Sequence, residues 1–128
     1  MVRVLYVALG GAIGTVLRFV LSGGVHVWVN STYPWGTFAV NLLGSFLAGF
    51  LWRFFEQMLI PSYMRPFIFI GILGGFTTFS SYMLETLNLC RDGQYLAACG
   101  NMLLHNICGM VVIMAGFMLA QVVLNAFK

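Results

Sequence analysis

Charged residues divide this chain into long stretches without charge. Residues 4–17, 19–52, 66–84 and 93–127 contain no Asp, Glu, Lys or Arg. Each stretch approaches or exceeds the roughly 20 residues that cross a bilayer as an α-helix. The pattern predicts an all-α integral membrane protein, with one domain over residues 1–128 and four spans over residues 4–21, 35–54, 66–89 and 95–124.

Composition supports this interpretation and excludes several classes of protein. Of the 128 residues, 61% are hydrophobic and only 7% are charged, too few to cover a water-soluble domain. The connections are too short to form an aqueous catalytic, nucleotide-binding or nucleic-acid-binding domain, so we expect no enzyme activity. The first span continues past Arg18 without a cleavage site, so we expect it to be retained rather than removed as a signal peptide.

The distribution of basic residues sets the expected orientation only weakly. With four spans both termini lie on one side, which would carry Arg3, Arg53, Arg65 and Lys128, against Arg18 and Arg91 on the other. The split is consistent either with a modest bias or with insertion in both directions. The three cysteines, Cys90, Cys99 and Cys108, contain no Cys-x-x-Cys pair, and we interpret them as packing residues.

Polar side chains inside the spans point to function, because each needs a partner or a water-filled cavity in hydrocarbon. Asn41 lies in the middle of the second span, and Asn101 and His105 share a face of the fourth. A four-helix bundle fills its own centre with side chains, so a chain of this size that moves a solute is expected to act as an oligomer.

The third span contains an unusual polar cluster. Two adjacent glycines, Gly74 and Gly75, precede four hydroxyl residues: Thr77, Thr78, Ser80 and Ser81. Adjacent glycines favour a break in the helix, and a break at membrane depth is tolerated only inside protein or beside a cavity. The freed carbonyls could hold a cation, and the hydroxyl and amide groups an anion. The alternative is an unbroken helix contact, with hydroxyls bonded to the preceding turn.

Two aromatic residues follow this cluster. Phe79 and Tyr82 are three residues apart, so on a helix they point the same way. Aromatic rings have positive edges, which can contact a small anion without a full opposite charge. With Asn41 and the hydroxyls they predict a donor-lined path that prefers anions.

The chain resembles a known family in three ordered segments. These are GGAIG at Gly10–Gly14 with Arg18 after it, GTFAVNLLG at Gly36–Gly44, and GILGGFTTFSS at Gly71–Ser81. They are similar to the signature segments of the Fluc (CrcB) fluoride channels. The resemblance covers the whole chain in order, and the Gly-Gly-x-Thr-Thr-Phe-Ser run is its most specific part.

This resemblance implies an antiparallel, dual-topology homodimer in the bacterial inner membrane. Such a dimer lets fluoride leave the cytoplasm passively, which protects the cell from fluoride, and involves neither nucleotide nor nucleic acid. It also implies a third span broken at mid-membrane and two pores per dimer. A structural sodium ion would lie at the dimer centre, bound by the backbone carbonyls of Gly74 and Thr77.

The resemblance further assigns roles by motif position. Asn41 matches the pore asparagine and Phe79 the first pore phenylalanine, whereas Tyr82 stands where the family has a second phenylalanine. Ser80 and Ser81 fall in the polar track. Arg18 and Glu85 are expected in the vestibule.

The fourth span departs further from the family. Asn101 and His105 occupy the positions where many relatives have a tyrosine and then a serine. We expect both on the fluoride path, where a histidine could make transport sensitive to pH. The alternative for His105 is a neutral imidazole at a helix contact.

Other functions fit less well. A four-span small multidrug-type transporter needs a carboxylate in its first span, and residues 4–17 contain none. A haem or quinone anchor would use His26 and His105, but we expect His26 in a loop and His105 in mid-span. A structural subunit without transport remains the last alternative.

Overall fold

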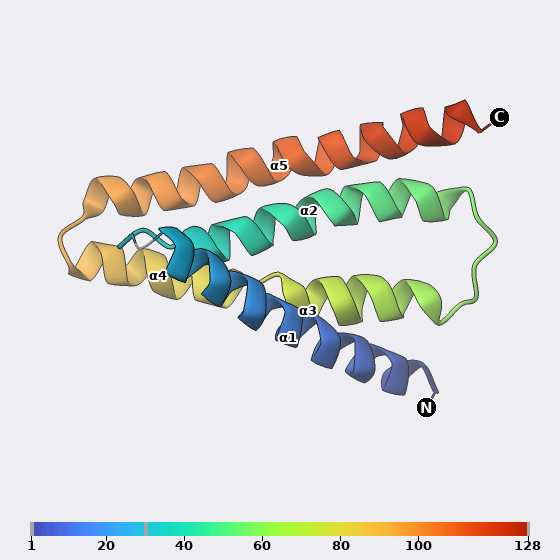
Figure 1. Cartoon of the computed structure of the whole chain (residues 1–128), viewed down its shortest axis with the longest axis horizontal. Helices are drawn as coiled ribbons and strands as arrows, with labels where there is room; N and C mark the ends of the chain where they lie inside the picture. Colours follow the sequence, from blue (N-terminus) through green and yellow to red (C-terminus); the bar gives the residue numbers. More distant parts are fainter. Residues whose placement is uncertain (1, 30, 128) are drawn as a thin grey trace.

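The computed structural model describes residues 2–29 and 31–127, which form helices joined by short connections (Figure 1). Four helical stretches are long and apolar enough to cross a membrane, so the four-span prediction is confirmed at that level. Lys128, which entered the charge count, lies outside the described residues. The helices are α1 (Val2–Val29), α2 (Trp35–Glu56), η1 (Pro66–Leu73), α3 (Gly74–Phe76), α4 (Phe79–Arg91) and α5 (Tyr95–Ala126).

The first helix is longer than the sequence suggested. We expected it to end near Leu21 and to be followed by a loop, but α1 continues to Val29 and includes Gly23 and Gly24. Backbone groups in lipid must be satisfied within the helix, and apolar residues continue beyond the glycines, so helix persists there. The placement of His26 in a loop was therefore wrong, because it lies in the last turn of α1.

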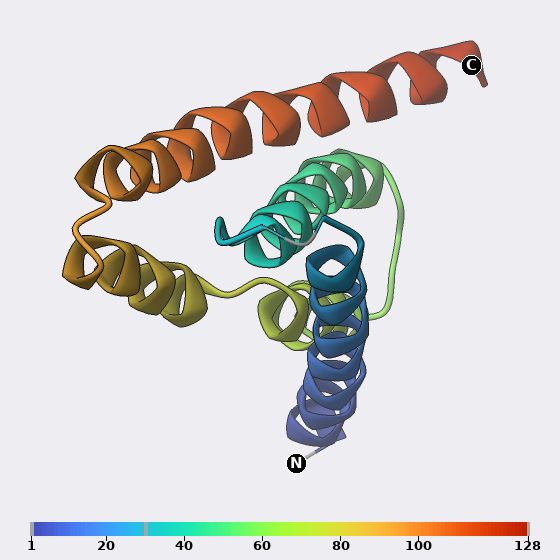
Figure 2. The same cartoon turned by 60° about the vertical axis from the view of Figure 1, so that its left-hand side comes forward.

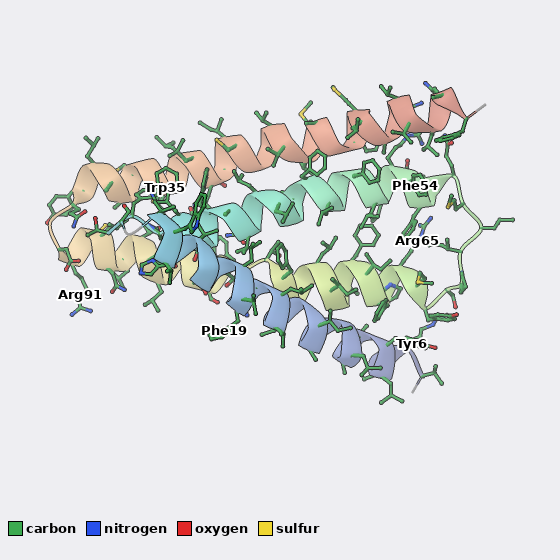
Figure 3. The ribbon with its side chains drawn as sticks, viewed as in Figure 1. Tyr6, Phe19, Trp35, Phe54, Arg65 and Arg91 are labelled. Carbon is green, nitrogen blue, oxygen red and sulfur yellow. The ribbon has the colours of Figure 1, made fainter. Side chains whose placement is uncertain are left out.

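The outer surface of the subunit is apolar. Phe19, Trp28 and Leu96 are 80%, 92% and 88% exposed, and many other large apolar side chains are open as well. Figure 3 shows Phe19 projecting away from the other helices. A protein with so much exposed apolar surface would aggregate in water, but such a surface is suited to contact with lipid or a partner subunit.

Most helix–helix contacts fall into two groups. α2 lies along α5, whereas α1 lies along η1 and α3 (Figures 1 and 2). Glycines permit the close α2–α5 crossing, because a Cβ atom at Gly49 would overlap the carbonyl of Ile113, and one at Gly116 would overlap that of Phe46. This reciprocal small-residue contact is typical of membrane helices.

The third span is interrupted after α3. Thr77 and Thr78 adopt extended backbone conformations, with φ/ψ of −81°/157° and −148°/119°. Figure 2 shows α4 turning away from η1 and α3 towards α5 at this point. The preceding η1 stretch is π-helical, a wider form that is frequent at functional sites. The third stretch is therefore interrupted at Thr77 and Thr78, and the position of this interruption at mid-membrane stays a prediction.

The two ends of the subunit differ. The start of α1 and the end of α5 lie at one end, together with the connection between α2 and η1 (Figure 1). The opposite end carries residues 31–34 and the turn between α4 and α5, where Gly93 has a positive φ of 72°. Glycine adopts this left-handed conformation without steric cost. That turn brings α5 back beside α4.

Candidate functional site

A single side chain braces the break in the third span. The Asn41 amide Nδ2 donates to the carbonyl oxygen of Thr78 at 3.0 Å, and the Thr78 backbone N–H donates to Asn41 Oδ1 at 2.8 Å. Asn41 therefore satisfies both polar groups that a helix would otherwise pair. This explains how extended backbone persists between two apolar helices.

Two hydrogen bonds at the break release two backbone carbonyl groups. In a continuous helix the Gly74 carbonyl would accept from the Thr78 N–H, but that N–H is bonded to Asn41. Likewise the Thr77 carbonyl would accept from the Ser81 N–H, which instead donates to Thr78 Oγ1 at 3.2 Å. The break thus frees the carbonyls of Gly74 and Thr77 from their helical partners. Neutral backbone oxygens of this kind are suitable ligands for a sodium ion.

One side of the break opens into a pocket of about 260 Å³, which we call the aromatic pocket. Phe79 is 73% exposed and lies at its open side, whereas Tyr82 is only 4% exposed. The two rings meet edge to face, with centroids 5.6 Å apart and an interplanar angle of 71°. The lining residues are Asn41, Ser45, Thr77, Thr78, Phe79, Tyr82, His105 and Asn106.

His105 lines this pocket and contacts two aromatic rings. Its ring lies 4.4 Å from the Tyr82 ring, centroid to centroid, and 5.1 Å from that of Phe38. Its Nδ1 atom lies 3.0 Å from the Asn101 carbonyl oxygen. The Asn106 amide Nδ2 donates a long hydrogen bond of 3.4 Å to the Tyr82 hydroxyl oxygen. The α4 and α5 helices therefore meet through a packed aromatic and amide cluster.

Asn101, by contrast, lines neither this pocket nor the cleft described below. It is completely buried between α5 and α4, and its amide Nδ2 donates to Thr86 Oγ1 at 2.8 Å. Thr86 Oγ1 in turn donates to the Tyr82 carbonyl at 2.8 Å. Within the described subunit Asn101 is a helix-contact residue next to the aromatic pocket, and the pore role expected for it stays a prediction.

The other side of the break faces a larger cleft of about 500 Å³, which we call the Arg18 cleft. One face of α1 supplies Thr15, Arg18, Ser22 and His26 to its wall, and α4 supplies Ser81 and Glu85. Glu85 Oε1 accepts a hydrogen bond from Thr37 Oγ1, while Oε2 is buried without a partner among the described residues. The two residues expected in the vestibule thus line one polar cleft.

Among the described residues, Thr78 alone lines both cavities. It lines both the aromatic pocket and the Arg18 cleft, and its hydroxyl contacts Ser81 Oγ at 3.0 Å and Ser80 Oγ at 3.4 Å. Ser80 is exposed, and Ser81 lines the Arg18 cleft. A polar route from one cavity to the other would therefore pass the Thr78 peptide and its hydroxyl neighbours.

Sequence reasoning missed two residues of this site. Thr37, which holds Glu85, lies four residues before Asn41 and so on the same face of α2. Asn106 adjoins His105 in a span without charge. In both cases the signal was a polar side chain in an apolar helix, and tertiary contacts were needed to assign it.

Comparison with known proteins agrees with this architecture. The family model described as CrcB-like protein, Camphor Resistance (CrcB), matches residues 5–117. A protein of Magnetococcus marinus named fluoride-specific ion channel FluC is 50% identical over 102 residues, 79% of this chain and 83% of that protein. Proteins with the same name from Opitutus terrae and Parabacteroides distasonis are 46% and 39% identical, over 97% and 100% of this chain and 96% and 100% of their own length.

The agreement extends through all four helical stretches. The matched residues 5–117 include the break at Thr77 and Thr78, the bracing Asn41, and the walls of both cavities. A family match over most of the chain, together with relatives that align over 83% to 100% of their own length, shows that the chain belongs to the CrcB family.

Proposed function

We propose that this protein is a passive, fluoride-selective channel that exports fluoride from the bacterial cytoplasm across the inner membrane. The observation that carries the proposal is the broken third span, whose Thr78 peptide is held by Asn41 between two polar cavities. The relatives named as fluoride-specific ion channels supply the identity of the ion.

The side chains at the break suit a small anion. Fluoride is costly to dehydrate, so a pore must offer closely spaced donors in place of water. Hydroxyls of Thr78, Ser80 and Ser81 lie together, and the second Asn41 N–H is not used by Thr78. The exposed ring of Phe79 adds a positive edge. None of these groups carries a full charge that would trap the ion.

The working unit is an antiparallel homodimer. One subunit leaves Phe79 73% exposed at the open side of the aromatic pocket, so a second copy could complete the wall of the path. The weak split of basic residues between the two sides is consistent with insertion in both orientations. In this arrangement each pore is formed by residues of both subunits.

A sodium ion would suit the centre of the dimer. The freed carbonyls of Gly74 and Thr77 would hold it, and the described residues contain no His, Cys, Asp and Glu cluster that could bind a metal instead. When bound, the ion supplies positive charge at the break. Asn41 keeps the Gly74 carbonyl free by accepting from the Thr78 N–H, and Thr78 Oγ1 keeps the Thr77 carbonyl free by accepting from the Ser81 N–H.

A small multidrug-type transporter is the alternative, but the acidic residues are misplaced for it. The chain has only three Asp and Glu residues, at Glu56, Glu85 and Asp92, and α1 contains none. No carboxylate is therefore available in the first span to couple proton and substrate. The channel reading requires no such group.

Fluoride efflux from proteoliposomes tests the function. Liposomes loaded with fluoride should release it only when they contain the protein and a counter-ion pathway, and liposomes loaded with chloride should not release chloride. Concentration of fluoride against its electrochemical gradient by a pH difference, after correction for HF leak, would contradict the channel. Cysteine labelling of one terminus from both membrane faces would test dual topology.

A further inference from the structure

The Arg18 cleft continues into a second cavity that no role has been assigned to. This cavity of about 360 Å³, which we call the outer compartment, lies at the end of the bundle formed by residues 31–34 and the α4–α5 turn. His26, Pro34 and Glu85 line both cavities. The shared residues indicate one continuous polar passage from that end of the subunit to Thr78.

The two cavities differ in charge. Arg18 lines the inner Arg18 cleft, whereas the described lining of the outer compartment contains neither Lys nor Arg and includes the carboxyl residues Glu85 and Asp92. An anion in the outer compartment would therefore meet carboxyl groups before it reaches Arg18. Asp92 is exposed, and its carboxylate opposes the approach of an anion.

We propose that His26, when protonated, promotes the entry of anions from the outer compartment into the Arg18 cleft. The inference rests on the proposed channel function and extends it to this chain's own access route. His26 is the basic side chain in the last turn of α1, and it lies where the two cavities meet. Its imidazole carries a positive charge only when protonated, so its effect on anions depends on pH.

The groups around His26 support this role. Arg18 lies two helical turns away on the same helix, Glu85 faces the junction from α4, and Asp92 faces it from the α4–α5 turn. Tyr33 contributes a buried hydroxyl without a partner among the described residues, and burial raises its pKa, so it stays a neutral donor. The start of α2 contributes the uncharged Gly36 and Thr37, and Pro34 precedes them.

Protonation of His26 should raise the rate at which fluoride enters the cleft. A cation at the junction offsets the field of Asp92 and extends the positive surface of Arg18 outward. We expect fluoride current to rise by about three- to tenfold between about pH 7.5 and about pH 5.5, because acid favours the positively charged imidazole at the junction. Because the effect is electrostatic, it should shrink at high ionic strength.

Fluoride currents through the purified dimer in planar bilayers test the proposal, because neutral HF carries no current. His26→Gln should give a low current that no longer changes with pH. His26→Lys, which keeps a positive charge throughout, should give a high current without pH dependence. Asp92→Asn should raise the wild-type current at pH 7.5, since it removes the opposing charge.

The outcomes separate this proposal from the channel function. Absence of fluoride current in the wild-type protein at every pH would refute the function itself. A wild-type current that is independent of pH, or an unchanged pH response in His26→Gln, would overturn the role of His26 and leave the channel intact. If His26→Gln does not form a dimer, His26→Lys tests the proposal instead. A fluoride current in His26→Lys that changes with pH as in the wild type would overturn the proposal.

Discussion

The side-chain amide of Asn41 forms a pair of hydrogen bonds with the backbone of Thr78, at 3.0 Å and 2.8 Å. One residue of α2 thus takes the place of the helical partners that the third span lacks. Asn41 is therefore a brace for the break as well as a potential anion donor. Only its remaining N–H can contact fluoride while the brace is intact.

Replacement of Asn41 by Asp should damage both roles. The carboxylate cannot donate to the Thr78 carbonyl, and it places negative charge beside the proposed anion path. We expect a loss of about 1–3 kcal/mol in unfolding free energy, the cost of an unsatisfied buried group, and a strong fall in fluoride flux. Thermal unfolding in detergent and flux in liposomes measure the two effects.

The matched control is Asn125→Asp. Asn125 is an exposed amide near the end of α5 and accepts one hydrogen bond from Gln121, so the same chemical change should leave flux and stability nearly unaltered. If Asn41→Asp behaved like this control, the brace would not be needed.

Much of the scaffold could be predicted from sequence because lipid restricts the choices. Charge-free stretches fixed four helices, and adjacent glycines with hydroxyls indicated the break. The end of α1 could not be placed, since glycines that end helices in water are tolerated where backbone groups must be paired internally. The prediction of a loop at His26 was wrong for this reason.

The contact between Tyr82 and His105 shows the limit for the site. Sequence placed the two residues in different spans, but their ring contact, with centroids 4.4 Å apart, depends on the relative rotation of α4 and α5. The same rotation turns Asn101 into the buried contact with Thr86. Spacing within one helix gives a shared face but not which neighbour that face meets.

The two ring positions should differ in their contribution to flux. Phe79 is exposed at the open side of the aromatic pocket, so Phe79→Ile removes a ring edge that an ion can reach. Tyr82→Phe removes only a hydroxyl whose contact with Asn106 is 3.4 Å long. We expect a large fall in fluoride flux for Phe79→Ile and a small change for Tyr82→Phe.

Flux at matched protein content in liposomes measures this difference, and size-exclusion chromatography checks that both variants assemble. Full activity of Phe79→Ile together with loss in Tyr82→Phe would mean that the ion path has been assigned to the wrong ring.

The α2–α5 crossing should depend on Gly116. A Cβ atom there would overlap the Phe46 carbonyl, which belongs to backbone and cannot rotate away. We expect Gly116→Val to separate the helices and to lower the yield of folded protein. The free energy of unfolding should fall by about 1–3 kcal/mol. Gly100→Ala is the control in the same helix, because nothing lies within 4 Å of an added Cβ atom in the subunit. Equal thermal stability of the two variants would contradict this account of the crossing.

Sodium should stabilise the protein through the carbonyls freed at the break. A ligand that binds only the folded state raises stability by RT ln(1 + [L]/Kd), about 2.7 kcal/mol at a hundredfold excess over Kd. We therefore expect thermal unfolding at a higher temperature in sodium chloride than in the chloride of a bulky organic cation at equal ionic strength.

Thr77→Ala keeps the backbone carbonyl and should retain this difference. Thr78→Ala removes the hydroxyl that accepts from the Ser81 N–H, so that this N–H can return to the Thr77 carbonyl, and sodium stabilisation should weaken. An unfolding temperature of the wild type that does not change with the cation would rule out a structural sodium ion at these carbonyls.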